Sequence, residues 1–302
     1  MTASQNHESI RAITLGEYPR ALPQYLLPQR LITRITYHLA RVRAIWFKNA
    51  FIRIFSAAYQ VDMSEAVESD PRAYPHFNAF FTRALRPDAR PIVVGTDNLC
   101  CPVDGAVSQA GVIRGDSVLQ AKGRDFSLLQ LLGGDAQHAG LFAGGLFATL
   151  YLAPRDYHRI HMPIRGVLRE MVHIPGRLFS VSPLTTRLVP GLFARNERVV
   201  ARFDTAMGPL TLVLVGAINV ASIETVWAGV ITPPLGTAIR RWSYPDSGPG
   251  AVVLEKGAEM GRFNMGSTVI VLCPTGALRW DSSLQAGATL RMGQKLAAIV
   301  SA

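Results

Sequence analysis

Cysteine is scarce in this chain: Cys100, Cys101 and Cys273 are the only three among 302 residues. Their number is odd and their spacing matches no metal motif, which argues against a disulfide scaffold and fits a reducing compartment. Long apolar runs are also missing, since no stretch reaches the ~18 uninterrupted apolar residues of a membrane-spanning helix. Residues 1–20 are polar and lack the apolar segment of a secretory signal. We therefore expect neither a secreted scaffold nor a spanning helix.

Acidic residues are outnumbered. The chain has 31 Lys and Arg against 21 Asp and Glu, a net charge of +10, and almost all of the cations are arginine. This balance favours an anionic partner, either a nucleic acid or an anionic membrane surface. The hydrophobic fraction, 49%, is ordinary for a globular protein with a real core. The length allows one large domain or two small ones.

No Asp or Glu occurs between Glu17 and Asp62, and residues 22–60 have a helical pattern. Apolar residues recur at helical spacing and basic residues interrupt them: Leu31, Ile35, Leu39, Val42, Ile45, Trp46, Ile52 and Phe55 against Arg30, Arg34, Arg41, Arg43, Lys48 and Arg53. This composition is typical of a helix that lies on a membrane surface. A core-packing helix with solvated arginines is the alternative.

After Pro87 the pattern becomes that of β-strands. Short apolar or alternating runs are separated by Gly and Pro at 144–151, 199–203, 210–215, 226–231, 251–254 and 268–272. This spacing predicts a β-sandwich or barrel, without βαβ rhythm, internal repeat or phosphate-binding loop. We expect a mainly β fold, α+β overall. It would comprise a flexible leader (1–20), an N-terminal helical membrane-associating region (21–84) and a β-rich catalytic domain (85–302). Within the helical region, Phe77, Phe80 and Phe81 should be core.

Three polar clusters hold the parts of a nucleophilic site. They are PVDG at 102–105, YHRIHMP at 157–163 and the Gly-Ser step at 266–267. They supply an acid (Asp104), imidazoles and a hydroxyl (Ser267), which nucleophilic catalysis requires.

Four segments, in the same order along the chain, carry a resemblance to a known family. They are YLAPRDYHRIHMP (151–163), LFSV (178–181), LFARNER (192–198) and GST (266–268). Here the chain resembles the phosphatidylserine decarboxylases of the bacterial membrane-associated type, from about Tyr25 to Ile270. Met265 stands where that family usually has Leu, and Ser182 where it usually has Asn.

The Gly266-Ser267 step suits self-cleavage. A serine hydroxyl can attack the carbonyl of the preceding residue and turn the amide into an ester, and glycine adopts the strained dihedrals that this needs. The attack requires a base and a group that orients the base. His161 is the candidate base and Asp104 the candidate orienting carboxylate.

The resemblance implies the remaining chemistry. β-Elimination splits the chain between Gly266 and Ser267 into a β chain (1–266) and an α chain (267–302). Ser267 becomes a pyruvoyl group, which forms a Schiff base with phosphatidylserine and releases carbon dioxide to give phosphatidylethanolamine. His158 would assist decarboxylation, as proton donor, and Ser180 would contribute to substrate binding or protonation. The implied location is peripheral, at the cytoplasmic face of the inner membrane, where the α/β heterodimer could dimerise further.

His158 and His161 would share one face if their segment were a helical turn. We expect no metal, because no third ligand has suitable spacing, and no nucleic-acid partner. A pyridoxal enzyme lacks a persuasive lysine here, and a serine hydrolase lacks the Gly-x-Ser-x-Gly elbow. A catalytically inactive membrane lipid-binding homologue is the remaining alternative. Because the catalytic residues all lie downstream, we expect removal of residues 1–60 to leave self-cleavage intact.

Overall fold

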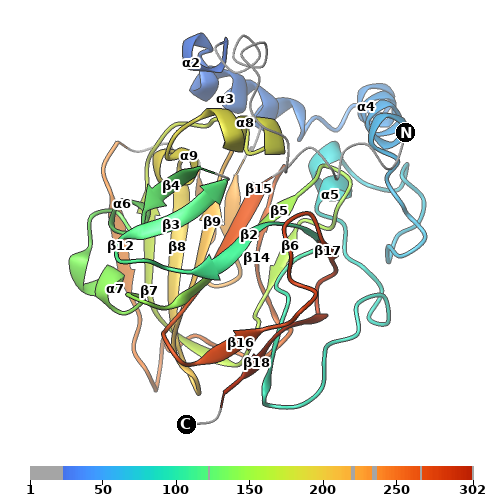
Figure 1. Ribbon diagram of the computed structural model, residues 1–302. Coiled ribbons are helices and arrows are strands. Elements are labelled where there is room, and N and C mark those ends of the chain that lie inside the picture. Colours follow the sequence, from blue (N-terminus) through green and yellow to red (C-terminus); the bar gives the residue numbers. More distant parts are fainter. Residues whose placement is uncertain (1–22, 122, 219–221, 233–236, 266, 301–302) are drawn as a thin grey trace.

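The computed structural model describes residues 23–121, 123–218, 222–232, 237–265 and 267–300. Strands form most of the molecule, and helices from the N-terminal part of the chain lie at one end of it (Figure 1). The predicted fold class, mainly β with an N-terminal helical region and α+β overall, is confirmed.

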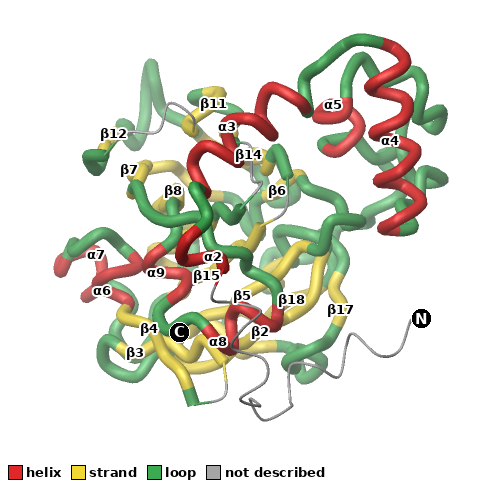
Figure 2. The backbone as a smooth tube through the Cα atoms, turned by 90° about the horizontal axis from the view of Figure 1, so that it is seen from above, coloured by secondary structure: helices red, strands yellow, loops and turns green. Residues whose placement is uncertain are grey.

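Within the described residues, four helices precede the first strand, and we call them the helical layer. They are α2 Pro23–Leu26, α3 Gln29–Leu39, α4 Ile45–Tyr59 and α5 Phe77–Phe81. α4 ends at Gln60, whose left-handed conformation (φ 54°) lets its N–H donate to the Ser56 carbonyl. α5 begins after His76, whose ring accepts a hydrogen bond from the Ala79 N–H at 3.0 Å. Seen from above, α5 lies beside α4 (Figure 2).

The largest sheet has nine strands, and its pairings are antiparallel. The strand order is β12 (Arg240–Ser243), β7 (Gly166–Ile174), β8 (Arg198–Thr205), β9 (Gly208–Val215), β15 (Ser267–Cys273), β5 (Leu146–Leu152), β2 (Gly105–Val112) and β17 (Thr289–Leu290), while β13 (Val253–Leu254) also pairs with β7. Consecutive residues at 210–215 and 268–272 are buried, so β9 and β15 are covered on both faces. This explains why these strands read as continuous apolar runs in the sequence.

Three smaller sheets complete the strand body. They comprise β11 (Gly229–Thr232), β10 (Ile223–Thr225), β14 (Glu259–Phe263) and β6 (Arg159–His161) in one; β1 (Asn98–Cys100), β18 (Lys295–Ile299) and β16 (Leu278–Trp280) in another; and β3 (Ser117–Ala121) with β4 (Arg124–Ser127) in the last. The short helices among them are α6 (Leu128–Leu131), α7 (Ala136–Gly140), α8 (Pro183–Leu188) and α9 (Leu192–Arg195).

The predicted strand runs differ from the observed strands most at 226–231, and at 251–254 only Val253–Leu254 is a strand. The run at 226–231 is not one strand, because residues 226–228 form the turn between β10 and β11. A glycine with positive φ, Gly229 (φ 67°), begins β11 after this turn. The apolar run therefore reverses direction where the sequence pattern alone predicts an extended segment.

Buried apolar residues form two clusters. The larger one fills the strand body. The smaller one joins α4 to α5 and includes Ile52, Phe55, Phe77, Phe80 and Phe81, so the three phenylalanines predicted as core are buried. The helical layer thus has an apolar core of its own.

Candidate active site at a double crossover

The site lies where the chain crosses twice between the nine-stranded and the four-stranded sheet. One crossover leads from β5 to β6 through residues 153–158, and the other leads from the end of β14 at Phe263 to the start of β15 at Ser267. β6 pairs with β14 and β5 pairs with β15, with Leu152 opposite Ser267. The N–H of Phe263 also donates to the His158 carbonyl at 3.0 Å. The two crossovers therefore run side by side, with the His158 backbone at the end of β14 and Leu152 opposite Ser267.

His161, the predicted base, stands at the end of β6 and is buried. Its Nδ1 lies 2.7 Å from the Gly257 carbonyl oxygen, which can only accept, so Nδ1 carries a proton. Its Nε2 lies 3.1 Å from the Tyr157 hydroxyl. Burial lowers the pKa of His161, against the opposing effect of the Gly257 hydrogen bond. The neutral ring thus has an Nε2 lone pair, which is what a general base needs.

Asp104 lies just before β2, which begins at Gly105. The packing requires a glycine at position 105, because a Cβ there would collide with the Tyr151 carbonyl oxygen. Arg90 Nε donates to Asp104 Oδ1 at 2.9 Å, and the Met292 N–H donates to the same oxygen at 2.8 Å. Burial lowers the pKa of Arg90, but hydrogen bonds to Asp104 outweigh it and raise the pKa above its ordinary value.

The structure brings Asp104 near His161 without a hydrogen bond between the two described side chains. The His161 backbone N–H donates to the Pro102 carbonyl at 2.8 Å, two residues before Asp104. The Asp104 charge is among the influences that raise the pKa of His161. In this geometry the Gly257 carbonyl orients the imidazole, and Asp104 acts on it through its charge.

His158 is fully buried in the β5–β6 crossover. Its Nδ1 donates to the Asp156 carbonyl at 2.8 Å, and its Nε2 has no hydrogen-bond partner among the described residues. Burial lowers the pKa of His158 to about 3, so the ring is neutral near pH 7. Its ring centroid lies 4.1 Å from that of Phe81 in α5. A buried nitrogen without a partner is costly, which is typical of a functional site.

The idea of a helical turn across the two histidines is wrong. His158 lies in the crossover and His161 on β6. The aromatic neighbour of His161 is Tyr157, at 5.6 Å between ring centroids and with the ring planes tilted by 32°. The chain is extended here because β6 must pair with β14.

The backbone just before Ser267 is strained, and buried hydrogen bonds fix it in place. Met265 has φ 113°, a conformation that favours glycine and strains a side-chain-bearing residue. Asn264 is fully buried, and its side-chain amide donates to the Ser222 hydroxyl and accepts from the Asn78 amide. Strain two residues ahead of Ser267 is consistent with a peptide bond prepared for reaction. Gly266 and the Ser267 side chain lie outside the described parts.

Comparison with known proteins adds to this geometry. The sequence model of the family described as phosphatidylserine decarboxylase matches residues 77–298, and one described as PSD matches residues 19–60. A phosphatidylserine decarboxylase proenzyme of Pseudomonas putida is 56% identical over 281 residues, which are 93% of this chain and 98% of that protein. One of Shewanella baltica is 55% identical over 275 residues, 91% of this chain and 94% of that protein.

The chain belongs to the phosphatidylserine decarboxylase family. The resemblance inferred from the four segments is thereby confirmed. The names of these relatives describe proenzymes, which are processed, and the Gly266-Ser267 step is the candidate processing site in this chain.

Ser180 and its neighbours have mainly structural contacts in this decarboxylase-family chain. The Ser180 N–H donates to Gln24 Oε1 at 2.9 Å, and the Ser180 hydroxyl accepts from the Ser182 N–H at 3.3 Å. Its described contacts do not include Asp104, His158 or His161. Asn196 hydrogen-bonds to the backbone of Phe179 and Gly216, and Glu197 pairs with His173 at 2.9 Å. Both act as supports of the strand body.

One cluster has ligand atoms close enough for a metal ion. Asp135, His138 and Glu170 place them within 4.8 Å of one another. The Arg241 guanidinium, however, lies 3.0 Å from Asp135 and 3.3 Å from Glu170. The arginine therefore neutralises both carboxylates, and this group has the character of an ion-pair cluster rather than a metal centre.

The sequence pattern does not single out several residues that lie at this site. Tyr157 lies in a quoted segment, but nothing in the sequence shows that its hydroxyl meets His161. Arg90 is one of many arginines. Asn78 and Asn264 are 186 positions apart, so only the folded chain reveals their hydrogen bond.

Proposed function

We propose that this chain is a proenzyme that cleaves itself between Gly266 and Ser267 and then decarboxylates phosphatidylserine to phosphatidylethanolamine. The observation that supports the proposal is the double crossover. It pairs Leu152 with Ser267 and bonds the His158 backbone to Phe263, just ahead of the strand that begins at Ser267, while both histidines keep an accepting Nε2 atom. Nothing in the comparisons favours the alternative, an inactive lipid-binding homologue.

Cleavage proceeds in balanced steps. The Ser267 hydroxyl loses its proton to His161 and its oxygen adds to the Gly266 carbonyl carbon. The C–N bond then breaks and the amine gains a proton, which leaves an ester. A base next removes the Cα proton of residue 267, and the Gly266 carboxylate departs, leaving dehydroalanine. Addition of one water and loss of one ammonia give the pyruvoyl group.

The chain's own residues have separate roles in these steps. His161 is the base for the hydroxyl, because its protonated Nδ1 faces Gly257 and leaves Nε2 to accept. Asp104 stabilises the imidazolium that results, through charge rather than through a direct hydrogen bond. Tyr157, which contacts Nε2 in the precursor, has to release it before the proton can be taken.

Ser267 is the proposed source of the cofactor, and the strained Met265 ahead of it fits a site of backbone rearrangement. The pyruvoyl group supplies a carbonyl that accepts the electron pair released as carbon dioxide leaves. His158 enters as a neutral base, accepts at Nε2 the proton that the substrate ammonium group loses, and gives it to the carbon that lost carbon dioxide. Its burial keeps water away from that proton transfer.

The two chains should stay together after cleavage. The α chain (267–302) contributes β15, which pairs with both β9 and β5, and β18, which pairs with β1. Each of these pairings joins the α chain to the β chain (1–266). The product is therefore an α/β heterodimer rather than two separate proteins.

The helical layer is the proposed membrane contact, in a peripheral position on the cytoplasmic face of the inner membrane. Apolar side chains on α3 and α4 are exposed: Leu31, Ile35, Leu39, Ile45, Trp46 and Ile54. None of the described helices is long and apolar enough to cross a bilayer. Exposed apolar residues beside Arg30, Arg34 and Arg53 suit an anionic lipid surface better than a nucleic acid.

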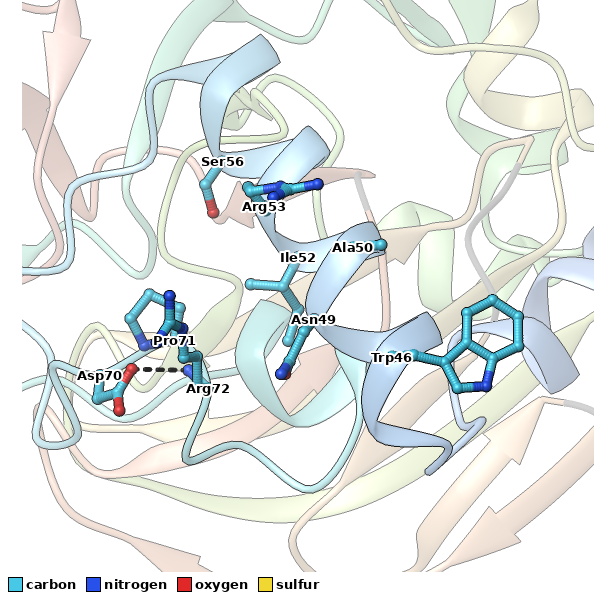
Figure 3. A pocket seen from close by; sticks show the side chains of 9 residues that line it. All are labelled: Trp46, Asn49, Ala50, Ile52, Arg53, Ser56, Asp70, Pro71 and Arg72. Carbon is cyan, nitrogen blue, oxygen red and sulfur yellow. Dashed lines mark hydrogen bonds between the residues drawn. The ribbon is translucent and has the colours of Figure 1, made fainter.

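A groove of about 640 Å³ runs between α4 and the segment at 70–72 (Figure 3). Trp46 and Arg53 line it from α4, and Arg72 lines it from the other side. An indole and two guanidinium groups in the lining of one groove suit the interfacial region of an anionic membrane, where aromatic rings and cations both bind favourably. This groove belongs to the proposed membrane-contacting surface.

An intact-mass spectrum of purified protein tests the function. The wild type should show two chains, with the pyruvoyl group at the start of the smaller one, and should release carbon dioxide from phosphatidylserine vesicles. Ser267→Ala should remain one inactive chain of full length, because the nucleophile and the cofactor precursor vanish together. Complete processing of this variant would refute the assignment, and a processed wild type without decarboxylation would favour the inactive alternative.

A further inference from the structure

The segment ahead of the scissile bond is fastened to the helical layer. Asn264 Oδ1 accepts from Asn78 Nδ2 at 2.8 Å, and both side chains are buried. The Asn264 backbone N–H donates to the Ser222 carbonyl at 2.9 Å, and its side-chain amide donates to the Ser222 hydroxyl. Asn264 is thus fixed from two directions, by α5 and by the residue preceding β10.

Met265 follows directly and carries the strained backbone (φ 113°). A side-chain-bearing residue stays in such a conformation only when its surroundings impose it. Here its two restraints are the anchored Asn264 and the packing of the Met265 side chain against the apolar cluster of α4 and α5. The packing of Met265 depends on the helical layer, and so does the Asn78 side of the Asn264 anchor.

Asn78 is in turn held by that layer. Its backbone N–H donates to the Ala40 carbonyl, just after α3, at 2.8 Å. Its neighbour Phe77 stacks on Phe51 of α4, with ring centroids 4.1 Å apart and planes 13° apart. α3 and α4 therefore determine where the Asn78 amide lies.

Asn78 is costly to keep as a purely structural residue. Its Oδ1 is buried and has no hydrogen-bond partner among the described residues. An apolar side chain of similar shape would avoid that desolvation cost. The amide therefore has a use that packing alone does not explain, and its one side-chain hydrogen bond leads to Asn264.

We propose that Asn78 is a positioning residue for self-cleavage and that the helical layer clamps residues 264–265 in the strained geometry from which Ser267 reacts. This inference rests on the proposed cleavage between Gly266 and Ser267. It reverses the expectation from the sequence that residues 1–60 are dispensable for processing, because α3 and α4 support Asn78 from within that range.

The test compares the conversion of precursor to processed chains after pulse labelling. Asn78→Leu and Asn264→Ala should each slow conversion about 10- to 100-fold, the loss expected when a reacting group is misplaced by about 1 Å. The double variant should be hardly slower than Asn264→Ala, because Asn264→Ala already removes the hydrogen bond that Asn78→Leu removes. Once formed, processed molecules of Asn78→Leu should decarboxylate phosphatidylserine within about 2-fold of wild type, since the clamp acts before cleavage.

Phe80→Leu is the matched control. Phe80 lies on α5 and contacts the rings of Phe55 and Tyr74, so its loss weakens the layer while leaving the Asn78 amide in place. Thermal unfolding of all variants is measured in the Ser267→Ala background, where every molecule is precursor. If Asn78→Leu converts as fast as a Phe80→Leu protein of equal Tm, or if its processed molecules are themselves slow, the inference is overturned. Cleavage of Ser267→Ala itself would instead refute the proposed function.

Discussion

His158 and His161 are three positions apart, yet their surroundings give them different chemistry. Both donate Nδ1–H to a backbone carbonyl, so both present Nε2 as an acceptor. The Nε2 of His161 meets a hydroxyl, while that of His158 is buried without a partner. The Nε2 of His161 therefore already has a hydrogen-bond partner, whereas the Nε2 of His158 has none among the described residues.

This difference predicts separate defects. His161→Ala should accumulate full-length precursor, because no base remains for the Ser267 hydroxyl. His158→Ala should still cleave but lose roughly 100- to 10,000-fold in decarboxylation, the range typical of a missing general acid or base. Gel analysis reports cleavage, and carbon dioxide release per processed molecule reports the second reaction. Normal turnover by processed His158→Ala, or cleavage of His161→Ala at the wild-type rate, would contradict these roles.

The candidate residues could be predicted because they lie in short contiguous segments that the family shares. Their partners could not. Asp104 was expected to orient His161, but its carboxylate meets Arg90 and the Met292 N–H, and the orienting group is the Gly257 carbonyl. A backbone carbonyl leaves no sequence signal, since every residue has one.

At the scale of elements, α4 shows that a basic amphipathic pattern can serve two surfaces. Ile52 and Phe55 are buried against α5, whereas Ile45, Trp46 and Ile54 are exposed. The core interpretation therefore holds for one face of the helix, and the exposed face is the one proposed to contact a membrane. Lys48 is an exception among the cations, because its Nζ is buried and donates to the Arg72 carbonyl at 2.7 Å.

The exposed face predicts a specific binding defect. Trp46→Ala should weaken co-sedimentation with anionic vesicles about 10-fold, because the indole is 77% exposed and its burial in lipid would be worth roughly 1.5–3 kcal/mol. Arg30→Gln and Arg34→Gln should each cost about 1 kcal/mol, and that cost should shrink as salt screens the charges.

Arg279→Gln is the control for charge alone. Arg279 is exposed on β16, which lies at the opposite end of the molecule from the helical layer (Figure 1). Its loss should leave vesicle binding unchanged. Equal losses from Arg279→Gln and Arg34→Gln would mean that net charge, not the helical layer, determines binding.

For the whole molecule, the arrangement that makes the site is the least predictable part. Most strand runs could be recognised from apolar patterns, but the double crossover depends on pairings such as Ser267 with Leu152 and Glu259 with His161. These pairings join segments about one hundred residues apart, and local patterns do not specify them. The histidines at the crossovers lie inside the protein, where burial favours the neutral form of the ring.

Those buried histidines predict a loss of stability in acid. Burial lowers the pKa of His138 to about 4 and that of His158 to about 3. Between these values and the ordinary pKa of about 6.5, the unfolded chain binds protons that the folded chain excludes, so stability falls as pH falls. Burial of Asp156 raises the pKa of its carboxyl to about 6 and opposes this trend below pH 6.

The net effect can be measured by urea unfolding of the Ser267→Ala precursor at pH 7.5 and pH 5. Each histidine contributes roughly 1.4 kcal/mol per pH unit below about 6.5 and Asp156 offsets one of them below about 6, so the free energy of unfolding should fall by roughly 2–3 kcal/mol. In the same background His158→Leu should show a clearly smaller fall, because one titrating ring is gone. Equal free energies at the two pH values would show that the buried rings are protonated in the folded state at pH 5, which would contradict the lowered pKa of His158.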